Sequence, residues 1–307
     1  MRIYKILFWL LLCTSLISGC NNSGDLNEKG VPKKLSIALY GGDNPAQTKE
    51  AIEPLRLYLK KKMGMDVDFF FTTDYTAVIE ALRSHKVQLA QLTPFAYILA
   101  TQKPGLVPIA TLGDNGKPSV YHSIIITSAQ SGIKNMADVK ARAKSLTLCF
   151  ADPASTSGHL IPRAYLNTIG LTPDNAFKEA IFAGSHAASI LSVKSGKIDI
   201  GCTNLDLSLD KLIRENTVKK EDFVILWTSP PILNDVFTVR NDLNKDFTKK
   251  LQSAFTDMAQ DDREAFSKYV RLYFPNTNKM AYMPIQDSMY NDLRKIAAGI
   301  KQFKLIK

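Results

Sequence analysis

The segment with the clearest chemical potential in this sequence consists of three hydroxyl residues and a glycine: Ser155, Thr156, Ser157 and Gly158. An apolar run at 146–150 predicts a buried strand before it, and the pattern at 160–169 predicts a helix after it. The first turn of a helix offers N–H groups without intrahelical acceptors and the positive end of the helix dipole. An ordinary helix cap would explain one hydroxyl. Three hydroxyls and a glycine predict a site for a small tetrahedral oxyanion.

The elements that must position this segment alternate between strand and helix from Lys34 onward. Strand patterns occur at 35–39, 67–71, 89–92, 107–112, 120–127, 146–150, 179–183, 198–202, 224–227 and 236–240. Helical patterns lie between most of them; the one at 46–63 is interrupted by Pro54, and the chain after 240 is helical. The alternation predicts an α/β fold with largely parallel sheets. The Ser-Pro-Pro break at 229–231 predicts two α/β units joined by crossing segments.

Polar loops follow the predicted strands at the ends where ligands bind in open α/β sheets. They are rich in hydroxyls, amides and glycine and poor in paired acids: 41–44, 72–75, 91–93, 155–157, 184–186 and 203–204. This composition suits an anion that is held by neutral donors. No set of nucleophile, base and orienting group is recognisable, and no Cys/His spacing suggests a metal site. The sequence therefore predicts a binding protein that is not an enzyme and uses no cofactor.

The N-terminus has the features of a secretory signal peptide. Arg2 and Lys5 precede an apolar run at 6–17 that is too short to span a bilayer comfortably. Residues 17–20 (Ile-Ser-Gly-Cys) resemble a bacterial lipobox, whose cysteine is acylated after cleavage. An ordinary signal peptide with an incidental cysteine is the alternative. We expect a lipoprotein signal peptide at 1–19 and an acylated Cys20, followed by a flexible tether to residue 33.

The composition is that of a globular protein with room for two lobes: 307 residues, 45% apolar and 22% charged. The net charge of +10 includes Arg2 and Lys5, so removing these two leaves +8. Lysines are spread over helices instead of gathering with aromatic residues, which argues against a nucleic-acid partner. The positive field favours anionic ligands. Cys149 and Cys202 each end an apolar strand; we expect buried free thiols, with a disulfide as the alternative.

With these loops in view, the chain resembles the phosphate-, phosphite- and phosphonate-binding subunits of bacterial ABC transporters. The matching stretches are 74–82 (DYTAVIEAL), 152–160 (DPASTSGHL), 184–186 (GSH) and 229–235 (SPPILND). The resemblance covers about 35–274 and implies a type II periplasmic-binding-protein fold, with a ligand cleft between two hinged lobes. We expect one lobe at 34–121 plus 236–307 and the other at 122–235. It also implies ABC permease and ATPase subunits as partners and, with Cys20, a lipid-anchored protein of the cell envelope that faces the periplasm or the cell exterior.

The resemblance further implies which residues contact the ligand. Tyr75 and Tyr121 match tyrosines that face the family's ligand, and Ser155, Thr156 and Ser157 match its oxyanion cradle. His186 and Asp235 match polar residues that line the cleft. Thr93, a threonine at a helix start, completes the expected ligand contacts. Hydroxyls donate to phosphoryl oxygens, and the Asp235 carboxylate can accept from a protonated P–OH group. Such an acceptor disfavours a fully ionised anion such as sulfate. Packing for the two tyrosines and helix capping for His186 are the alternative roles.

Three positions depart from the family pattern. Ala187 and Asn204 stand where relatives often have acids, and Thr93 stands where glycine is more usual. Without acids that could pair with an ammonium group, 2-aminoethylphosphonate is disfavoured, because a buried unpaired ammonium is costly. The predicted function is capture of a small phosphorus oxyanion (phosphite, phosphonate or phosphate) for ABC-transporter import. The alternatives are a ligand sensor of the same fold that signals to a membrane receptor, and a binder of a sulfonate or another small ligand.

Overall fold

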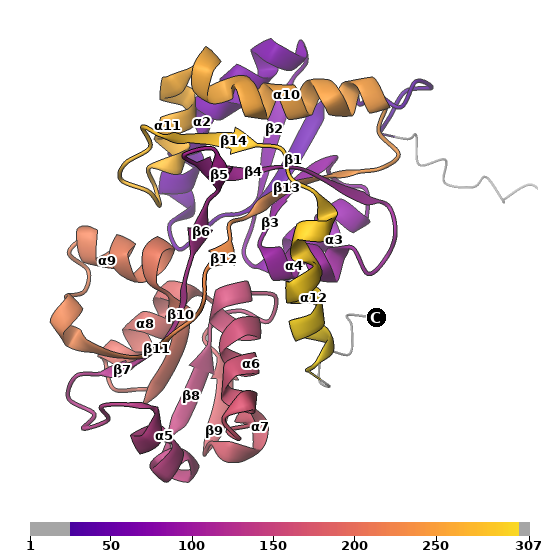
Figure 1. Cartoon of the computed structure of the whole chain (residues 1–307). Helices are drawn as coiled ribbons and strands as arrows, with labels where there is room; N and C mark the ends of the chain where they lie inside the picture. Colours follow the sequence, from indigo (N-terminus) through magenta and orange to yellow (C-terminus); the bar gives the residue numbers. More distant parts are fainter. Residues whose placement is uncertain (1–24, 301–307) are drawn as a thin grey trace, which may run out of the picture.

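The structure is a computed structural model that describes residues 25–300. The described chain forms two α/β lobes, one around each of two mixed sheets, joined by a pair of crossing strands (Figure 1). The predicted signal peptide and Cys20 lie outside the described residues. Within 25–300, no helix combines the length and the apolar character that a membrane span requires.

Lobe 1 is built on a sheet with the strand order β14–β4–β13–β3–β1–β2, and β5 pairs with β4. The bounds are β1 (Leu35–Tyr40), β2 (Val67–Thr72), β3 (Leu89–Leu92), β4 (Leu106–Asp114), β5 (Lys117–Pro118), β13 (Val236–Arg240) and β14 (Met280–Met283). β1 is parallel to β2 and β3, but β13 is antiparallel to both β3 and β4, and β14 is antiparallel to β4. The prediction of a largely parallel sheet was wrong here, because β13 returns from lobe 2 in the opposite direction. The purely helical region predicted after 240 was also wrong, since it contains β14.

The helices of lobe 1 cover its sheet on both faces (Figure 1). Their bounds are α2 (Pro45–Met63), α3 (Tyr75–Arg83), α4 (Pro94–Ala100), α10 (Lys245–Asp261), α11 (Arg263–Val270), the 3₁₀ turn η5 (Asp287–Tyr290) and α12 (Asn291–Ala298). The predicted interruption of α2 at Pro54 is absent, and the helix is continuous. Proline removes one backbone hydrogen bond. Burial of Ile52, Leu55 and Leu59 on the core side of α2 outweighs that loss.

Lobe 2 is built on a sheet with the order β11–β7–β10–β8–β9, in which β10, β8 and β9 are parallel and β7 is antiparallel to its neighbours. Its elements are β7 (Ser123–Ser128), α5 (Met136–Arg142), η1 (Ala143–Ser145), β8 (Thr147–Phe150), η2 (Thr156–Leu160), α6 (Ile161–Thr168), α7 (Pro173–Ala176), β9 (Glu179–Phe182), α8 (His186–Lys194), β10 (Ile200–Asn204), η3 (Leu205–Leu209), α9 (Asp210–Arg214), η4 (Lys220–Asp222) and β11 (Phe223–Thr228). Cys149 and Cys202 are buried free thiols, as expected.

The two lobes are joined by β6 (Val120–Tyr121) and β12 (Ile232–Leu233), which pair in antiparallel orientation. The strand predicted at 120–127 is therefore split at His122, where the chain leaves the connector and enters the lobe 2 sheet. The carboxylate of Asp206 holds this turn by accepting a hydrogen bond from the His122 backbone N–H at 2.7 Å. The C-terminal helix α12 also links the lobes, because it contacts α4 of lobe 1 and α6 of lobe 2 (Figure 1).

The segment at 25–33 is docked on lobe 1, which differs from the flexible tether expected up to residue 33. Arg240 is buried, and its guanidinium therefore requires a carboxylate partner. Asp25 supplies one, with an oxygen 2.6 Å from Nη1 of Arg240, and also accepts a hydrogen bond from Gln88 Nε2 at 2.6 Å. Leu26 and Val31 pack against the lobe 1 core. The chain from Asp25 onward thus belongs to the body of lobe 1.

Candidate functional site

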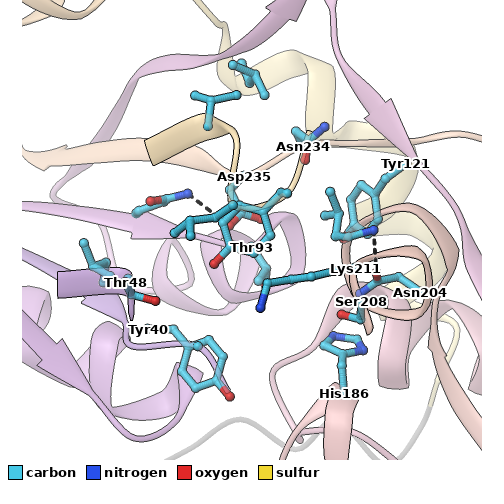
Figure 2. Close-up of a pocket in the computed structure, with 18 of the residues that line it drawn as sticks. Tyr40, Thr48, Thr93, Tyr121, His186, Asn204, Ser208, Lys211, Asn234 and Asp235 are labelled. Atoms are coloured by element: carbon cyan, nitrogen blue, oxygen red, sulfur yellow. Dashed lines mark hydrogen bonds between the residues drawn. The ribbon is translucent and has the colours of Figure 1, made fainter. Parts of the chain in front are cut away.

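A cavity of about 120 Å³ lies between the two lobes and is lined by residues of both (Figure 2). This volume is far below the roughly 300–1,000 Å³ of sites for drug-sized ligands, so the cavity suits a small ligand. The structure brings together all of the predicted contact residues except the side chain of Thr156; those that line the cavity are Tyr75, Thr93, Tyr121, Ser155, Ser157, His186 and Asp235.

The hydroxyl segment forms the lobe 2 wall of the cavity. Ser155 caps the wide, π-helical turn η2, and its Oγ accepts a hydrogen bond from the backbone N–H of Gly158 at 2.9 Å. A Cβ at Gly158 would lie 2.4 Å from the Cβ of Ala151, so only glycine lets the turn pack this closely on the end of β8. The hydroxyl of Ser123 donates to the carbonyl of Ser157 at 2.6 Å and fixes the turn. Ser155 and Ser157 both line the cavity, where their hydroxyls can act as donors.

His186 supports this wall as a neutral side chain. It is the first residue of α8, and Ser185 caps that helix. Its Nε2 lies 3.2 Å from Oγ of Ser155, and its Nδ1 lies 3.1 Å from Oγ1 of Thr203. Burial lowers the pKa of His186 to about 4, so the imidazole is uncharged at neutral pH. Because both ring nitrogens have protein partners, the geometry assigns His186 a role in orienting the Ser155 hydroxyl.

Several hydrogen bonds connect the lobes directly next to the cavity. Oγ1 of Thr156 accepts from the backbone N–H of Phe95 at 2.8 Å, and Oγ1 of Thr93 donates to the carbonyl of Ala154 at 3.2 Å. Both bonds join η2 and the loop before it to the start of α4. The Thr156 side chain is fully buried in this contact and does not line the cavity. Its assignment as a ligand contact stays a prediction.

Asp152 lies in the loop before η2, next to these contacts. Its carboxylate accepts from the backbone N–H of Ala154 at 2.7 Å and so holds the loop that contacts Thr93. Burial raises the pKa of Asp152 to about 6. The lobes are thus in contact around the cavity, and the described conformation is a closed one.

Two carboxylates of lobe 1 line the cavity: Asp43, which is exposed, and Asp235. Asp235 lies between β12 and β13, and Thr111 Oγ1 fixes its backbone by donating to its carbonyl at 2.8 Å. The carboxylate accepts from Gln91 Nε2 at 3.3 Å, and Gln91 Oε1 accepts from the Tyr269 hydroxyl at 2.7 Å. Burial raises the pKa of Asp235 to about 6. This carboxylate can therefore share a proton with a ligand near neutral pH.

The two predicted tyrosines, Tyr75 and Tyr121, also line the cavity. Tyr75 begins α3, where Asp74 caps the helix by accepting from the Ala77 backbone N–H at 2.7 Å, and its ring packs 4.7 Å from that of Tyr40. Tyr121 is buried in the connector. Burial raises the pKa values of both Tyr75 and Tyr121, so each retains its proton as a donor.

Sequence reasoning missed much of the remaining lining. Residues that it did not assign to the site include Tyr40, Thr48, Gln91, Ser208, Lys211, Asn234, Tyr269, Tyr273 and Tyr282. Gln91 lies in the polar strand-end loop at 91–93, and this position could have identified it as a site residue. Tyr269 and Tyr273 lie on the buried side of a helical pattern, and this pattern alone does not separate core residues from cavity residues.

The second π-helical turn, η3, forms another part of the lobe 2 wall. Asn204, one of the departures from the family pattern, caps this turn, and its Oδ1 accepts from the Leu207 backbone N–H at 3.0 Å. Asn204, Ser208 and Lys211 all line the cavity (Figure 2). Among residues 25–300, no group of three or more His, Cys, Asp or Glu side chains is placed to hold a metal ion.

Comparisons with known proteins agree with this geometry. The family model described as "ABC transporter, phosphonate, periplasmic substrate-binding protein" matches residues 37–290. The phosphate-import protein PhnD of Mycolicibacterium smegmatis is 28% identical over 301 residues, which cover 93% of this chain and 91% of the relative. The phosphonates-binding periplasmic protein of Escherichia coli is 29% identical over 233 residues, 76% of this chain and 68% of the relative.

Among solved structures, a binding-protein component of an ABC phosphonate transporter from Pseudomonas aeruginosa matches with a TM-score of 0.76 at 25% identity. The match covers 86% of this chain and 85% of that chain. This likeness confirms the predicted periplasmic-binding-protein fold with two lobes.

Proposed function

This chain belongs to the family of periplasmic substrate-binding proteins of phosphonate ABC transporters, and we propose that it captures a small phosphorus oxyanion for import. The observation that carries the proposal is the pairing, in one small cavity, of the Ser155 and Ser157 hydroxyls with the Asp235 carboxylate, whose pKa is raised. Phosphite, phosphate and alkylphosphonates offer both oxygens that accept and, when singly protonated, a P–OH group that donates.

In the proposed complex, the ligand oxygens bind to the first-turn amides of η2 and to the Ser155 and Ser157 hydroxyls. Tyr75 and Tyr121 donate from the opposite side. The carboxylate of Asp235 accepts a hydrogen bond from the ligand's P–OH group, which selects against sulfate because sulfate has no proton to donate near neutral pH. The closed lobes exclude water, and this strengthens each of these bonds.

Isothermal titration calorimetry of the chain without its predicted signal peptide tests the proposal, with phosphite, phosphate, methylphosphonate, 2-aminoethylphosphonate and sulfate as ligands. We expect phosphite or methylphosphonate to bind most tightly, and 2-aminoethylphosphonate and sulfate to bind more weakly. Failure of all the phosphorus compounds to bind would refute the function. Tight binding of 2-aminoethylphosphonate alone would refute the selectivity.

The proposal includes a lipid anchor at Cys20. It is supported by the sequence Ile-Ser-Gly-Cys at 17–20 after a short apolar run, and by the family's extracytoplasmic location. Such an anchor holds the binding protein at the membrane, next to the permease that receives its ligand. Mass spectrometry of membrane-extracted protein should find an N-terminal, acylated Cys20. A mature N-terminus at another residue, without lipid, would contradict it.

A further inference from the structure

Lys211 introduces a positive charge into the cavity that the proposed oxyanion site does not use. It lies on α9 in lobe 2, and its side chain is only 15% exposed. Figure 2 shows its ammonium group pointing into the cavity, among the labelled lining residues. Of the described residues that line the cavity, Lys211 is the only lysine or arginine.

The orientation of α9 supports this placement. Arg214 lies one turn after Lys211 on the same side of the helix, and its Nη2 donates to the carbonyl of Tyr273 in lobe 1 at 3.0 Å. This contact crosses from lobe 2 to lobe 1 and turns that side of α9 toward the cleft. Lys211 is therefore held against the cavity when the lobes are closed.

The surroundings of Lys211 suit a negatively charged group. The neighbouring lining residues on this wall are Asn204, Leu207 and Ser208, which carry an amide, an apolar side chain and a hydroxyl. Nζ of Lys211 lies 3.1 Å from Glu215 Oε1, outside the cavity lining, and this pair occupies one of the three ammonium donors. The remaining donors can bind a second anion on the cavity side.

In the proposed complex, η2 and Asp235 bind the phosphoryl group of the ligand, and they lie on other parts of the cavity wall. A group on the phosphorus substituent would reach the wall formed by η3 and α9. A carboxylate there would accept charge-assisted hydrogen bonds from Lys211. An ammonium group there would meet a like charge in a largely desolvated space, which is unfavourable.

On these grounds, and resting on the proposed function, we propose that the ligands of this protein include phosphonates with a carboxylate on their substituent, which Lys211 binds. This substrate class is more specific than a phosphorus oxyanion. Lys211 is then the residue that determines selectivity for the substituent, while the η2 turn and Asp235 bind the phosphoryl group common to all these ligands.

Calorimetry with phosphonoacetate, ethylphosphonate and 2-aminoethylphosphonate tests this proposal, because the three differ mainly in the charge of the terminal group. We expect the native protein to bind phosphonoacetate at least about tenfold more tightly than ethylphosphonate, as for a hydrogen bond to a charged group. In Lys211→Met this preference should fall to about twofold or less. Lys194→Met is the matched control, since Lys194 pairs with Asp222 in the same lobe but does not line the cavity.

Each outcome decides the proposal. A preference of the native protein for ethylphosphonate or 2-aminoethylphosphonate over phosphonoacetate overturns it without any variant. A preference for phosphonoacetate that survives in Lys211→Met, and in Lys211→Gln if the first variant does not fold, overturns the role of Lys211. If neither phosphite nor methylphosphonate binds, the proposed function itself fails and this proposal fails with it. Binding of methylphosphonate without the carboxylate preference rejects only the present proposal.

Discussion

The two walls of the cavity are built in different ways. The lobe 2 wall takes its donors from consecutive residues at the η2 turn, fixed by a cap, a glycine and one serine contact. In the lobe 1 wall, the Asp235 carboxylate lies next to the connector and accepts a hydrogen bond from Gln91, which in turn accepts one from Tyr269. These three residues are far apart in the sequence. In the proposed complex, lobe 2 thus supplies a preformed anion site, whereas lobe 1 recognises the ligand's P–OH group through a network that depends on the tertiary fold.

The largest effect should come from removing the Asp235 charge from the lobe 1 wall with Asp235→Asn. A hydrogen bond to a charged group contributes roughly 1.5–3 kcal/mol, so phosphite and methylphosphonate should bind about 10- to 150-fold more weakly. The monoethyl ester of methylphosphonate, which has no P–OH proton when ionised, should lose less affinity. Calorimetry on both ligands measures the difference, and equal losses would argue that Asp235 does not accept a hydrogen bond from the ligand's P–OH group.

The same substitution should stabilise the unliganded protein, with a defined pH dependence. Burial raises the pKa of Asp235 from 3.8 to about 6, which corresponds to a cost of roughly 3 kcal/mol for ionising it in the folded state. That cost is fully present above pH 6 and fades as the pH falls toward 3.8. Asp235→Asn should therefore melt at a higher temperature than the native protein at pH 7.5, and the difference should shrink at pH 4. A difference independent of pH would contradict the assignment.

On the lobe 2 wall, Ser157→Ala removes a hydroxyl that lines the cavity. Binding of phosphite and methylphosphonate should weaken by about 10-fold or more, because the lost bond goes to a charged oxygen. The ester of methylphosphonate should be affected equally, in contrast to Asp235→Asn, since this wall recognises oxygens and not the proton. Ser195→Ala is the control: its Oγ donates to the Ser192 carbonyl on an exposed part of lobe 2. An affinity change below twofold in Ser157→Ala would exclude the hydroxyl as a ligand contact.

The same difference between the walls explains what could be predicted from sequence. The η2 segment could be identified because caps, hydroxyls and Gly158 act within a few residues of one another. Gln91 and Tyr269 could not be assigned in this way, since their link to Asp235 depends on how β3, β13 and α11 pack. The antiparallel return of β13 and the strand β14 were missed for the same reason, because pairing partners lie far away in the chain. Helices and strands were largely predictable, but their pairing required the structure.

A smaller effect is expected from Thr156→Val, which separates two roles for this residue. If Thr156 only bonds to the Phe95 backbone N–H, the variant loses one neutral hydrogen bond between the lobes, worth roughly 0.5–1.5 kcal/mol. Affinity should then fall about 2- to 10-fold for every ligand, and Thr156→Ser should restore it. A loss of 100-fold would instead indicate a direct contact with the ligand's charged oxygens, as the sequence predicted.

The smallest effect should come from Tyr269→Phe, at the far end of the lobe 1 network. The variant keeps the ring but removes the hydroxyl that donates to Gln91 Oε1 at 2.7 Å. Gln91 is then less firmly oriented, and its bond to Asp235, which lowers the pKa of that carboxyl, should weaken. We expect methylphosphonate to bind only about 2- to 4-fold more weakly, within the range of one neutral hydrogen bond. The pKa of Asp235, read from the pH dependence of binding between pH 5 and 8, should rise further above 6.

Tyr58→Phe is the matched control, since the Tyr58 hydroxyl donates to Asp261 in lobe 1 at 3.0 Å and does not line the cavity. If the pH profile of Tyr269→Phe is the same as that of the native protein and of Tyr58→Phe, the lobe 1 wall does not act as a network, and Asp235 acts independently of Tyr269.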